Sequence, residues 1–296
     1  MCGPTAAGKS RLALWLAERT DVTIVSADSR QLYRGFDIGT AKPTPAERRA
    51  VPHCGVDVLD ATQRASAAWW ADHADAWIRE TMAQGRVPLV VGGTGLYLRA
   101  LFGVLFEEPP LDENRRVALR GELSAYPTER LRRWVRELDP ARAALGRTQL
   151  LRALEIALLA GRRVSDLHRE RQRPARWSAR YLVVDPGPEL ATRIESRVEA
   201  MMAAGWRKEV RRLIAEVPAD APAWNATGYR AIRLLEAGEL AESDAVHRVI
   251  VETRQYAKRQ RTWFRHQLAE DDVTRLDPRD PDWEARALSW WQPWHA

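Results

Sequence analysis

The stretch Gly3-Pro4-Thr5-Ala6-Ala7-Gly8-Lys9-Ser10 decides the fold class. It fits the pattern G-x-x-x-x-G-K-[ST], in which the backbone N–H groups of a glycine-rich loop point into one concavity and hold phosphate groups. Lys9 adds a positive charge, and the Ser10 hydroxyl is placed to bind a magnesium ion that bridges the phosphates. Residues 11–20 are rich in Leu and Ala and predict a helix whose N-terminal dipole points at the anion. We therefore predict an α/β fold in which a phosphate-binding loop borders a parallel sheet flanked by helices.

Three short apolar runs predict buried strands of that sheet, at residues 22–26, 87–91 and 181–184. A phosphate-binding loop normally follows the end of a central strand. Only Met1 and Cys2 precede Gly3, so we expect either that the start codon is assigned too late or that the sheet lacks its usual first strand.

Two polar side chains follow predicted strands. Asp28 comes directly after residues 22–26, and Thr94 lies in the glycine-rich loop after residues 87–91. Open α/β sheets bind ligands at the carboxyl ends of their strands. A carboxylate there can bind magnesium through water, or accept a proton from an incoming nucleophile. The alternative for both side chains is a structural role as the cap of a turn or helix.

Composition limits the class of protein. The chain has 296 residues, a hydrophobic content of 45%, a formal net charge of +6 and a pI near 9.7, which favours a globular protein with a polyanionic partner. Its two cysteines, Cys2 and Cys54, exclude a disulfide framework or a zinc ligand set. No apolar run reaches the roughly 18–20 residues that span a bilayer. We expect a cytosolic monomer that does not bind membranes.

A helical region interrupts the predicted core. Residues 112–176 have a helical pattern and many arginines, among them Arg116 and Arg152. We predict a helical domain inserted into a core formed by residues 1–111 and 177–296. For any single arginine, the alternative is a solvated charged surface.

The C-terminal part predicts one long helix over residues 242–266. Its basic residues at 4-3-4 spacing share a face, and these are Arg254, Lys258, Arg261 and Arg265. The neighbouring stripe predicted to pack consists of Val246, Ile250, Thr253 and Ala257. Such a basic face contacts phosphates more often than bases. The tail that follows, with Trp283, Trp290, Trp291 and Trp294, predicts a packed C-terminal cap.

Three segments in this order and spacing resemble the tRNA dimethylallyltransferase family: GPTAAGKS at 3–10, SADSRQLYRGFDIGTAKP at 26–43 and VVGGTGLYLRAL at 90–101. The likeness continues through 152–155, 193–197, 228–230 and 253–265. Two elements depart from the family pattern. His53-Cys54 stands where a His-His pair is common, and Gly146-Arg147-Thr148-Gln149 replaces an Asn-Asp-x-x-Arg element.

The resemblance implies a reaction and its participants. A dimethylallyl group passes from dimethylallyl diphosphate to N6 of the adenosine just 3′ of the tRNA anticodon, with Mg²⁺ as cofactor. Asp28 is then the general base, and Thr94 lies in the reaction channel. The diphosphate is held by Gly3, Thr5, Ala6, Ala7, Gly8, Lys9 and Ser10 with Arg193 and Arg197, and Ser10 binds the metal. The residues expected to contact the tRNA anticodon arm are Asp28, Ser29, Arg30, Gln31, Thr94, Arg116, Gln149, Arg152, Asn225, Gly228, Tyr229 and Arg230, with Arg254 and Lys258 added from the basic helix.

This chemistry suits the residues. An adenine amine is a poor nucleophile, so the electrophile must be an allylic carbon whose diphosphate leaves easily. Preplaced cations and backbone amides then stabilise the charge that accumulates on the leaving group. The alternatives are an ATP-dependent small-molecule kinase, which the glycine-threonine loop and the arginine-rich insertion disfavour, and a tRNA-binding protein that has lost catalysis.

Overall fold

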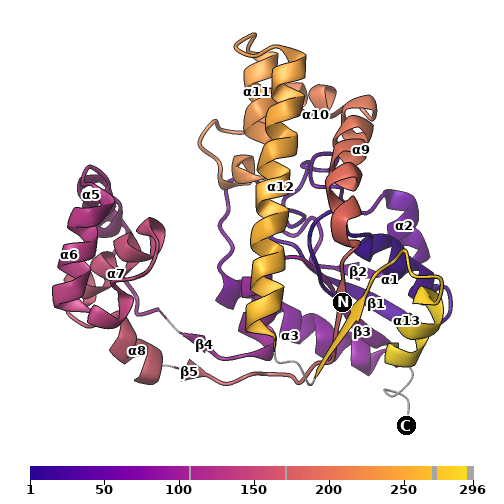
Figure 1. Cartoon of the computed structure of the whole chain (residues 1–296), viewed down its shortest axis with the longest axis horizontal. Coiled ribbons are helices and arrows are strands. Elements are labelled where there is room, and N and C mark those ends of the chain that lie inside the picture. Colours follow the sequence, from indigo (N-terminus) through magenta and orange to yellow (C-terminus); the bar gives the residue numbers. More distant parts are fainter. Residues whose placement is uncertain (107, 171, 269–271, 292–296) are drawn as a thin grey trace. The chain divides into compact units, whose positions relative to one another are not determined.

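The computed structural model describes residues 1–106, 108–170, 172–268 and 272–291, and their contacts divide into two compact units (Figure 1). The first unit contains Met1–Phe102 and the chain from Arg176 onward, and the second is Gly103–Ala175. The protein is mixed α/β, with a small parallel sheet and many helices. No described helix is both long and apolar enough to cross a membrane.

The sheet of the first unit is parallel, and its strands follow from the apolar runs. β1 (Val22–Ala27) is buried along its whole length and pairs with β2 (His53–Cys54) on one side and β3 (Val87–Gly92) on the other. β6 (Tyr181–Val184) pairs with β7 (Val273–Leu276) in the same direction. The three strands expected from the sequence are confirmed.

Met1 and Cys2 occupy the position between β3 and β6, so the expectation that no strand leads into the loop is corrected. Cys2 forms parallel bridges to Gly92 and to Val183. The Cys2 N–H donates to Leu182 O at 2.8 Å, and Cys2 O accepts from Val184 N–H at 2.8 Å. Two residues are thus enough to join the strand pairs and to fix the point from which the loop begins.

Helices α1 (Lys9–Ala17) and α13 (Trp283–Trp291) share one core cluster with the sheet. Trp290 and Trp291 are buried in it, which confirms the predicted C-terminal cap for these residues, while Trp294 lies outside the described residues. α3 (Ala67–Ala83) and α4 (Gly95–Phe102) pack together through the stacked rings of Trp70 and Tyr97, whose centroids lie 4.7 Å apart. The remaining short elements are α2 (Pro45–Ala50), η2 (Gly187–Glu189) and η3 (Pro222–Asn225).

Four further helices complete this unit: α9 (Leu190–Ala203), α10 (Trp206–Glu216), α11 (Tyr229–Glu236) and α12 (Glu242–Gln267). Figure 1 shows α12 extending from the region of the sheet alongside α9 and α11. The long helix is confirmed, but its packed stripe is displaced from the predicted one. The buried positions are Ala245, Val249, Ala257, Gln260 and Phe264. Only Ala257 belongs to both sets, because the helix turns a polar residue, Gln260, toward the sheet.

The second unit consists of helices closed by a two-stranded ribbon. In chain order its elements are β4 (Leu105–Phe106), α5 (Glu113–Ser124), α6 (Thr128–Leu138), η1 (Pro140–Arg142), α7 (Arg147–Ala160), α8 (Val164–Glu170) and β5 (Gln172–Arg173). Its separate apolar core includes Leu131, Leu150, Leu154 and Ile156. Within it, the fully buried Glu155 carboxylate accepts hydrogen bonds from Arg120 Nε at 2.6 Å and Arg116 Nε at 3.0 Å.

Replacing Glu155 with glutamine is expected to destabilise this unit by about 3 kcal/mol, because two arginines lose a buried counter-charge. Burial alone would raise the pKa of Glu155, but the hydrogen bonds from Arg120 and Arg116 outweigh it and lower the pKa below its ordinary 4.5. The stabilisation is therefore present above that value and is lost as the pH falls through the lower, folded-state pKa. Denaturant unfolding followed by hydrogen exchange in α5 and α7 measures the effect. Glu122→Gln, at an exposed position of α5, is the control; equal stability of the two variants would contradict the role of the buried charge.

Candidate functional site

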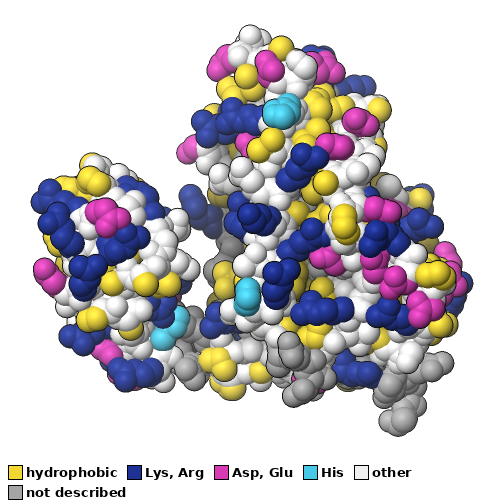
Figure 2. All heavy atoms as spheres, viewed as in Figure 1, with side chains coloured by type: hydrophobic (Ala, Val, Ile, Leu, Met, Phe, Trp, Pro, Cys, Tyr) yellow, Lys and Arg dark blue, Asp and Glu magenta, His cyan; other side chains and the backbone are white. Residues whose placement is uncertain are grey.

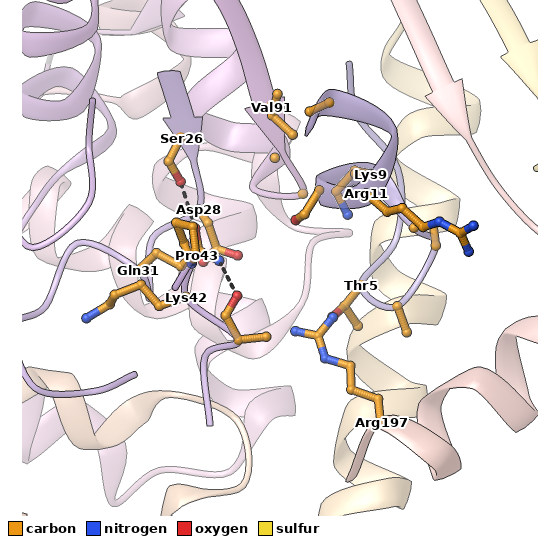
Figure 3. A pocket seen from close by; sticks show the side chains of 18 of the residues that line it. Thr5, Lys9, Arg11, Ser26, Asp28, Gln31, Lys42, Pro43, Val91 and Arg197 are labelled. Carbon is orange, nitrogen blue, oxygen red and sulfur yellow. Dashed lines mark hydrogen bonds between the residues drawn. The ribbon is translucent and has the colours of Figure 1, made fainter. Parts of the chain in front are cut away.

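A cavity of about 790 Å³ opens where the Gly3–Ser10 loop meets the carboxyl ends of β1 and β3 (Figure 3). Its wall includes residues 5–10 of the loop, Asp28 and Gln31 after β1, Arg193 and Arg197 on α9, and Tyr256 and Gln260 on α12. This volume lies within the range of cavities that bind small ligands. The cavity therefore collects residues from both ends of the sequence around the loop that was predicted to bind phosphate.

The local conformation of the loop depends on small residues. Gly3 has φ +145°, and a Cβ there would lie 2.2 Å from Val184 O, so only glycine fits beside β6. Ala6 and Gly8 also have positive φ, at 62° and 97°, and α1 begins immediately after Gly8. Lys9 closes the loop by donating from Nζ to Pro4 O at 2.7 Å. The first turn of α1 thus faces the cavity with its unpaired N–H groups, an arrangement that binds anions.

Charge in the cavity is unbalanced. Burial, followed by the nearby charge of Arg197, lowers the pKa of Lys9 to about 8, and the Asp28 carboxylate only partly opposes this. Burial likewise lowers the pKa of Arg197, again against the attraction of Asp28. Figure 3 shows Lys9, Thr5 and Arg197 across the cavity from Asp28. Arg11, Lys42 and Arg193 also line the cavity, as do Glu47 and Glu189, so five basic residues stand against three acidic ones. This excess of positive charge favours the binding of an additional anion.

Asp28 and Thr94 are brought together, as their positions after neighbouring strands predict. The Thr94 N–H donates to Ala27 O at 3.1 Å, and its Oγ1 accepts from Ser29 N–H at 3.1 Å. Asp28 Oδ1 accepts from Arg30 N–H at 2.8 Å, so the carboxylate does cap a turn. Asp28 nevertheless also lines the cavity. Thr94 is not among the lining residues, and its hydroxyl instead fixes the turn that carries Asp28. The two roles considered for Asp28 are therefore compatible.

The other residues expected near the diphosphate or the base lie on α9 and in the segment after β1. Arg193 and Arg197 are one turn apart on α9 and both line the cavity. Arg193 also pairs with Glu189 at 3.2 Å. Gln31 lines the same cavity and donates from Nε2 to Ala41 O at 3.1 Å. Arg30 lines a smaller adjoining cavity that Asp28 and Arg197 share.

The segment around α11 corrects two expected tRNA contacts. Tyr229 is fully buried, and its hydroxyl donates to Glu209 Oε1 at 2.7 Å. Gly228 is buried as well, with φ +86°, and a Cβ there would meet the Trp206 ring at 2.4 Å. Both residues shape the turn into α11, because an aromatic core lies directly beneath it. Asn225 and Arg230 are exposed and line a separate surface pocket.

The expected contacts in the second unit are held by neighbouring side chains. Arg116 pairs with Glu108 at 3.2 Å as well as with Glu155, and its side chain is only 22% exposed. Arg152 pairs with the other oxygen of Glu108 at 2.9 Å, and its side chain is 48% exposed. Gln149 Oε1 accepts from Gly146 N–H at 3.2 Å, which caps α7. Arg152 and Gln149 are therefore exposed to a partner, whereas Arg116 is largely enclosed.

Several residues that organise the site were not singled out from the sequence. Glu209 Oε2 accepts from the N–H groups of Asp37 and Ile38, at 3.0 and 2.7 Å, and so anchors the loop after β1 to α10. Tyr256 hydrogen-bonds Thr94, and burial raises the pKa of its hydroxyl to about 12. The Gln260 side chain hydrogen-bonds to the backbone of Thr5 in one loop and of Gly93 in another. The sequence did contain one indication for the two α12 residues: Tyr256 and Gln260 are four positions apart, which places them on one face of the helix.

The chain matches known proteins over most of its length. A family model described as IPP transferase matches residues 31–267. The chain belongs to the IPP transferase family. The resemblance inferred from the motifs is thereby confirmed, and it disfavours the kinase alternative.

Members of the IPP transferase family align with nearly the whole chain. The tRNA dimethylallyltransferase of Gloeobacter violaceus is 44% identical over 284 residues, which cover 94% of this chain and 91% of the relative. That of Anaeromyxobacter dehalogenans is 42% identical over 294 residues and 97% of each chain. Among solved structures, the tRNA isopentenylpyrophosphate transferase of Bacillus halodurans has a TM-score of 0.68 at 32% identity, covering 97% of this chain and 92% of that one. A eukaryotic dimethylallyltransferase acting on tRNA has a TM-score of 0.80 at 25% identity, covering 97% and 75%.

Proposed function

We propose that this chain transfers the dimethylallyl group of dimethylallyl diphosphate to the N6 amine of the tRNA adenosine just 3′ of the anticodon, and releases diphosphate. The observation that carries the proposal is the cavity in which a phosphate-loop sequence, Lys9 and Arg197 lie across from the Asp28 carboxylate (Figure 3). Family membership supports the same reaction, because the similar proteins named above are tRNA dimethylallyltransferases.

The Gly3–Ser10 loop and α9 are proposed to hold the diphosphate. Lys9, Arg193 and Arg197 line the cavity on this side, and the first turn of α1 adds backbone N–H groups. As the C–O bond to the allylic carbon breaks, negative charge accumulates on the leaving diphosphate. Donors that are already in position stabilise this charge without reorganising. Partial burial of Lys9 and Arg197 strengthens their interaction with it, since less water screens them than at the surface.

Asp28 is proposed to accept the proton that the adenine amine loses as the new C–N bond forms. Its carboxylate lines the cavity opposite the loop, and Thr94 and Arg30 fix the turn that carries it. A general base must lie within hydrogen-bond reach of the proton that it removes. The smaller adjoining cavity, also lined by Asp28, is where we place part of the base. The adenosine must leave its stack to reach it.

Magnesium fits this site only together with phosphate ligands. The described residues contain no group of three or more His, Cys, Asp or Glu side chains that could hold a metal ion. Ser10, at the start of α1, lines the cavity and offers one hydroxyl. Mg²⁺ commonly takes one or two protein ligands, with the rest from phosphate oxygens and water. When bound through Ser10 and the diphosphate, the ion would neutralise charge on the leaving group.

The second unit and α12 are proposed to bind the tRNA. Figure 2 shows many Lys and Arg side chains on the face of the protein that α12 presents. Of the four cations predicted to share that face, Arg254 pairs with Glu195 and Arg261 pairs with Asp185. Lys258 and Arg265 are exposed. Salt bridges thus neutralise half of the basic face, so the phosphate contacts should come from Lys258 and Arg265.

Removing these two charges by Lys258→Ala and Arg265→Ala is expected to weaken tRNA binding regardless of sequence. It should reduce the slope of log affinity against log salt by about 0.7–0.9 per lost phosphate contact. Affinity measured at several salt concentrations for cognate and non-cognate tRNA tests this. The control pair Lys208→Ala and Arg49→Ala removes the same charges at exposed positions outside α12. An unchanged slope for the first pair would mean that this face is only solvated.

The proposed function is tested by incubating the purified protein with unmodified tRNA, Mg²⁺ and labelled dimethylallyl diphosphate. Label that becomes covalently attached to tRNA, and depends on both substrates, is the expected result. ATP should neither be consumed nor replace the diphosphate, whereas ATP turnover without label in tRNA would favour the kinase. Binding of tRNA with no transfer under any condition would favour a protein that has lost catalysis.

A further inference from the structure

Gln260 joins two loops that are remote in sequence. It lies on α12, its residue is 7% exposed, and both ends of its amide bond to backbone. Oε1 accepts from Thr5 N–H at 2.8 Å, and Nε2 donates to Gly93 O at 2.8 Å. We propose that Gln260 is a positioning residue, which holds the Gly3–Ser10 loop and the Gly93–Thr94 turn in the relative geometry that the transfer requires.

The amide fits in only one orientation. A flip would place its oxygen against Gly93 O and its NH₂ group against Thr5 N–H, so both bonds would be lost. The second of them is buried, and an unpaired buried polar group costs more than the bond itself contributes. The Thr5 N–H is also committed to Gln260. Gln260 therefore fixes the start of the loop, and both Thr5 and Gln260 lie in the wall of the cavity.

Close packing connects Gln260 to the proposed general base. A Cβ on Gly93 would lie 2.2 Å from Gln260 Nε2 and 3.1 Å from Gly3 O, so no side chain separates the helix from the two loops. The next residue, Thr94, accepts from Ser29 N–H beside Asp28. A series of hydrogen bonds between side chains and backbone thus runs from the proposed diphosphate loop, through Gln260 and Thr94, to the turn that carries the carboxylate. Displacing the amide should change the distance between them.

The inference rests on the proposed function and is tested with Gln260→Met, which keeps the size of the side chain and removes both hydrogen bonds. Misplacement of reacting groups by about 1 Å can cost about 100-fold in rate, so we expect kcat to fall by about 10- to 100-fold. The Kd for dimethylallyl diphosphate should rise, and the Kd for tRNA should not change. Gln255→Met makes the same change at an exposed position of α12 and should leave every constant unchanged. If Gln260 had only a structural role, Gln260→Met would instead lower the melting temperature and the active fraction, while kcat per active site and both Kd values stayed normal.

Gly93→Ala provides a second route that does not alter Gln260. Its methyl group should push the amide away and reproduce the kinetic defect of Gln260→Met. Because both changes break the same connection, the double variant should be no worse than either single one, whereas independent defects would multiply. Normal kcat and diphosphate Kd in Gln260→Met, or multiplying defects, would overturn the proposal. Diphosphate binding by calorimetry gives this answer even if the wild-type protein transfers nothing, and in that case only the proposed function fails.

Discussion

Replacing Asp28 with asparagine is expected to lower the rate of transfer by about 10²- to 10⁴-fold, the usual cost of losing a general base. The substitution separates the two roles of this side chain. Asparagine Oδ1 still accepts the Arg30 N–H that Asp28 Oδ1 accepts at 2.8 Å, so the turn keeps its cap. The carboxylate that we propose as the acceptor of the amine proton is lost. Single-turnover kinetics with saturating tRNA and dimethylallyl diphosphate measure the step directly.

The affinity for tRNA should stay close to that of the wild type, because the turn is preserved. Asp282→Asn, at an exposed position before α13, controls for the loss of one negative charge. If Asp28→Asn transfers within a few-fold of the wild-type rate, while Asp28→Ala is impaired, the carboxylate serves only as a cap. The base would then have to be sought elsewhere in the cavity.

Lys9→Ala is expected to weaken the use of dimethylallyl diphosphate by about 10- to 100-fold, the range for a hydrogen bond to a charged group. Lys9 belongs to the loop proposed to hold the leaving group, so tRNA binding should be nearly unaffected. Titration calorimetry with dimethylallyl diphosphate, and separately with tRNA, distinguishes the two affinities. An equal loss of both affinities would show that the loop has been disrupted as a whole.

The dependence of this binding on pH gives an independent check of Lys9. Its pKa in the free protein is lowered to about 8, so the ammonium loses its charge as the pH rises through that value. An anion stabilises the charged form, which raises the pKa in the complex and makes binding take up a proton. Affinity for the diphosphate should therefore fall above about pH 8 in the wild type. The same decline in Lys9→Ala would assign it to the ligand or to another group.

The sequence predicted those parts of the fold and site that depend on local pattern. The loop at 3–10, the strand after α1 and Asp28 at its end were all predictable, because each is specified by a short run of residues or by the direction of a parallel strand. Arg193 and Arg197 also line the cavity as expected, since one helical turn separates them. The long helix α12 was predicted to within one residue at its C-terminal end.

What could not be predicted depends on partners far apart in the chain. Gln260 is separated by 255 residues from Thr5 and by 167 from Gly93, and no local pattern indicates these bonds. Tyr229 was expected at the RNA because residues 225–230 resemble a tRNA-contacting segment of the family. It is buried because Glu209, 20 residues earlier, accepts from its hydroxyl. Arg116 and Arg261 are similar cases, since an arginine that pairs inside the protein has the same sequence signature as one that meets phosphate.

The most direct test of the account is the identity of the modified nucleoside. Unmodified tRNA is incubated with the protein, Mg²⁺ and dimethylallyl diphosphate, digested with nucleases and analysed by tandem mass spectrometry. We predict one modified adenosine, just 3′ of the anticodon, in which a dimethylallyl group replaces one hydrogen on N6. The wild type should release one diphosphate per modified tRNA, and Asp28→Asn should release almost none. A modification on another atom or another nucleotide, or diphosphate release without any modified adenosine, would contradict this prediction.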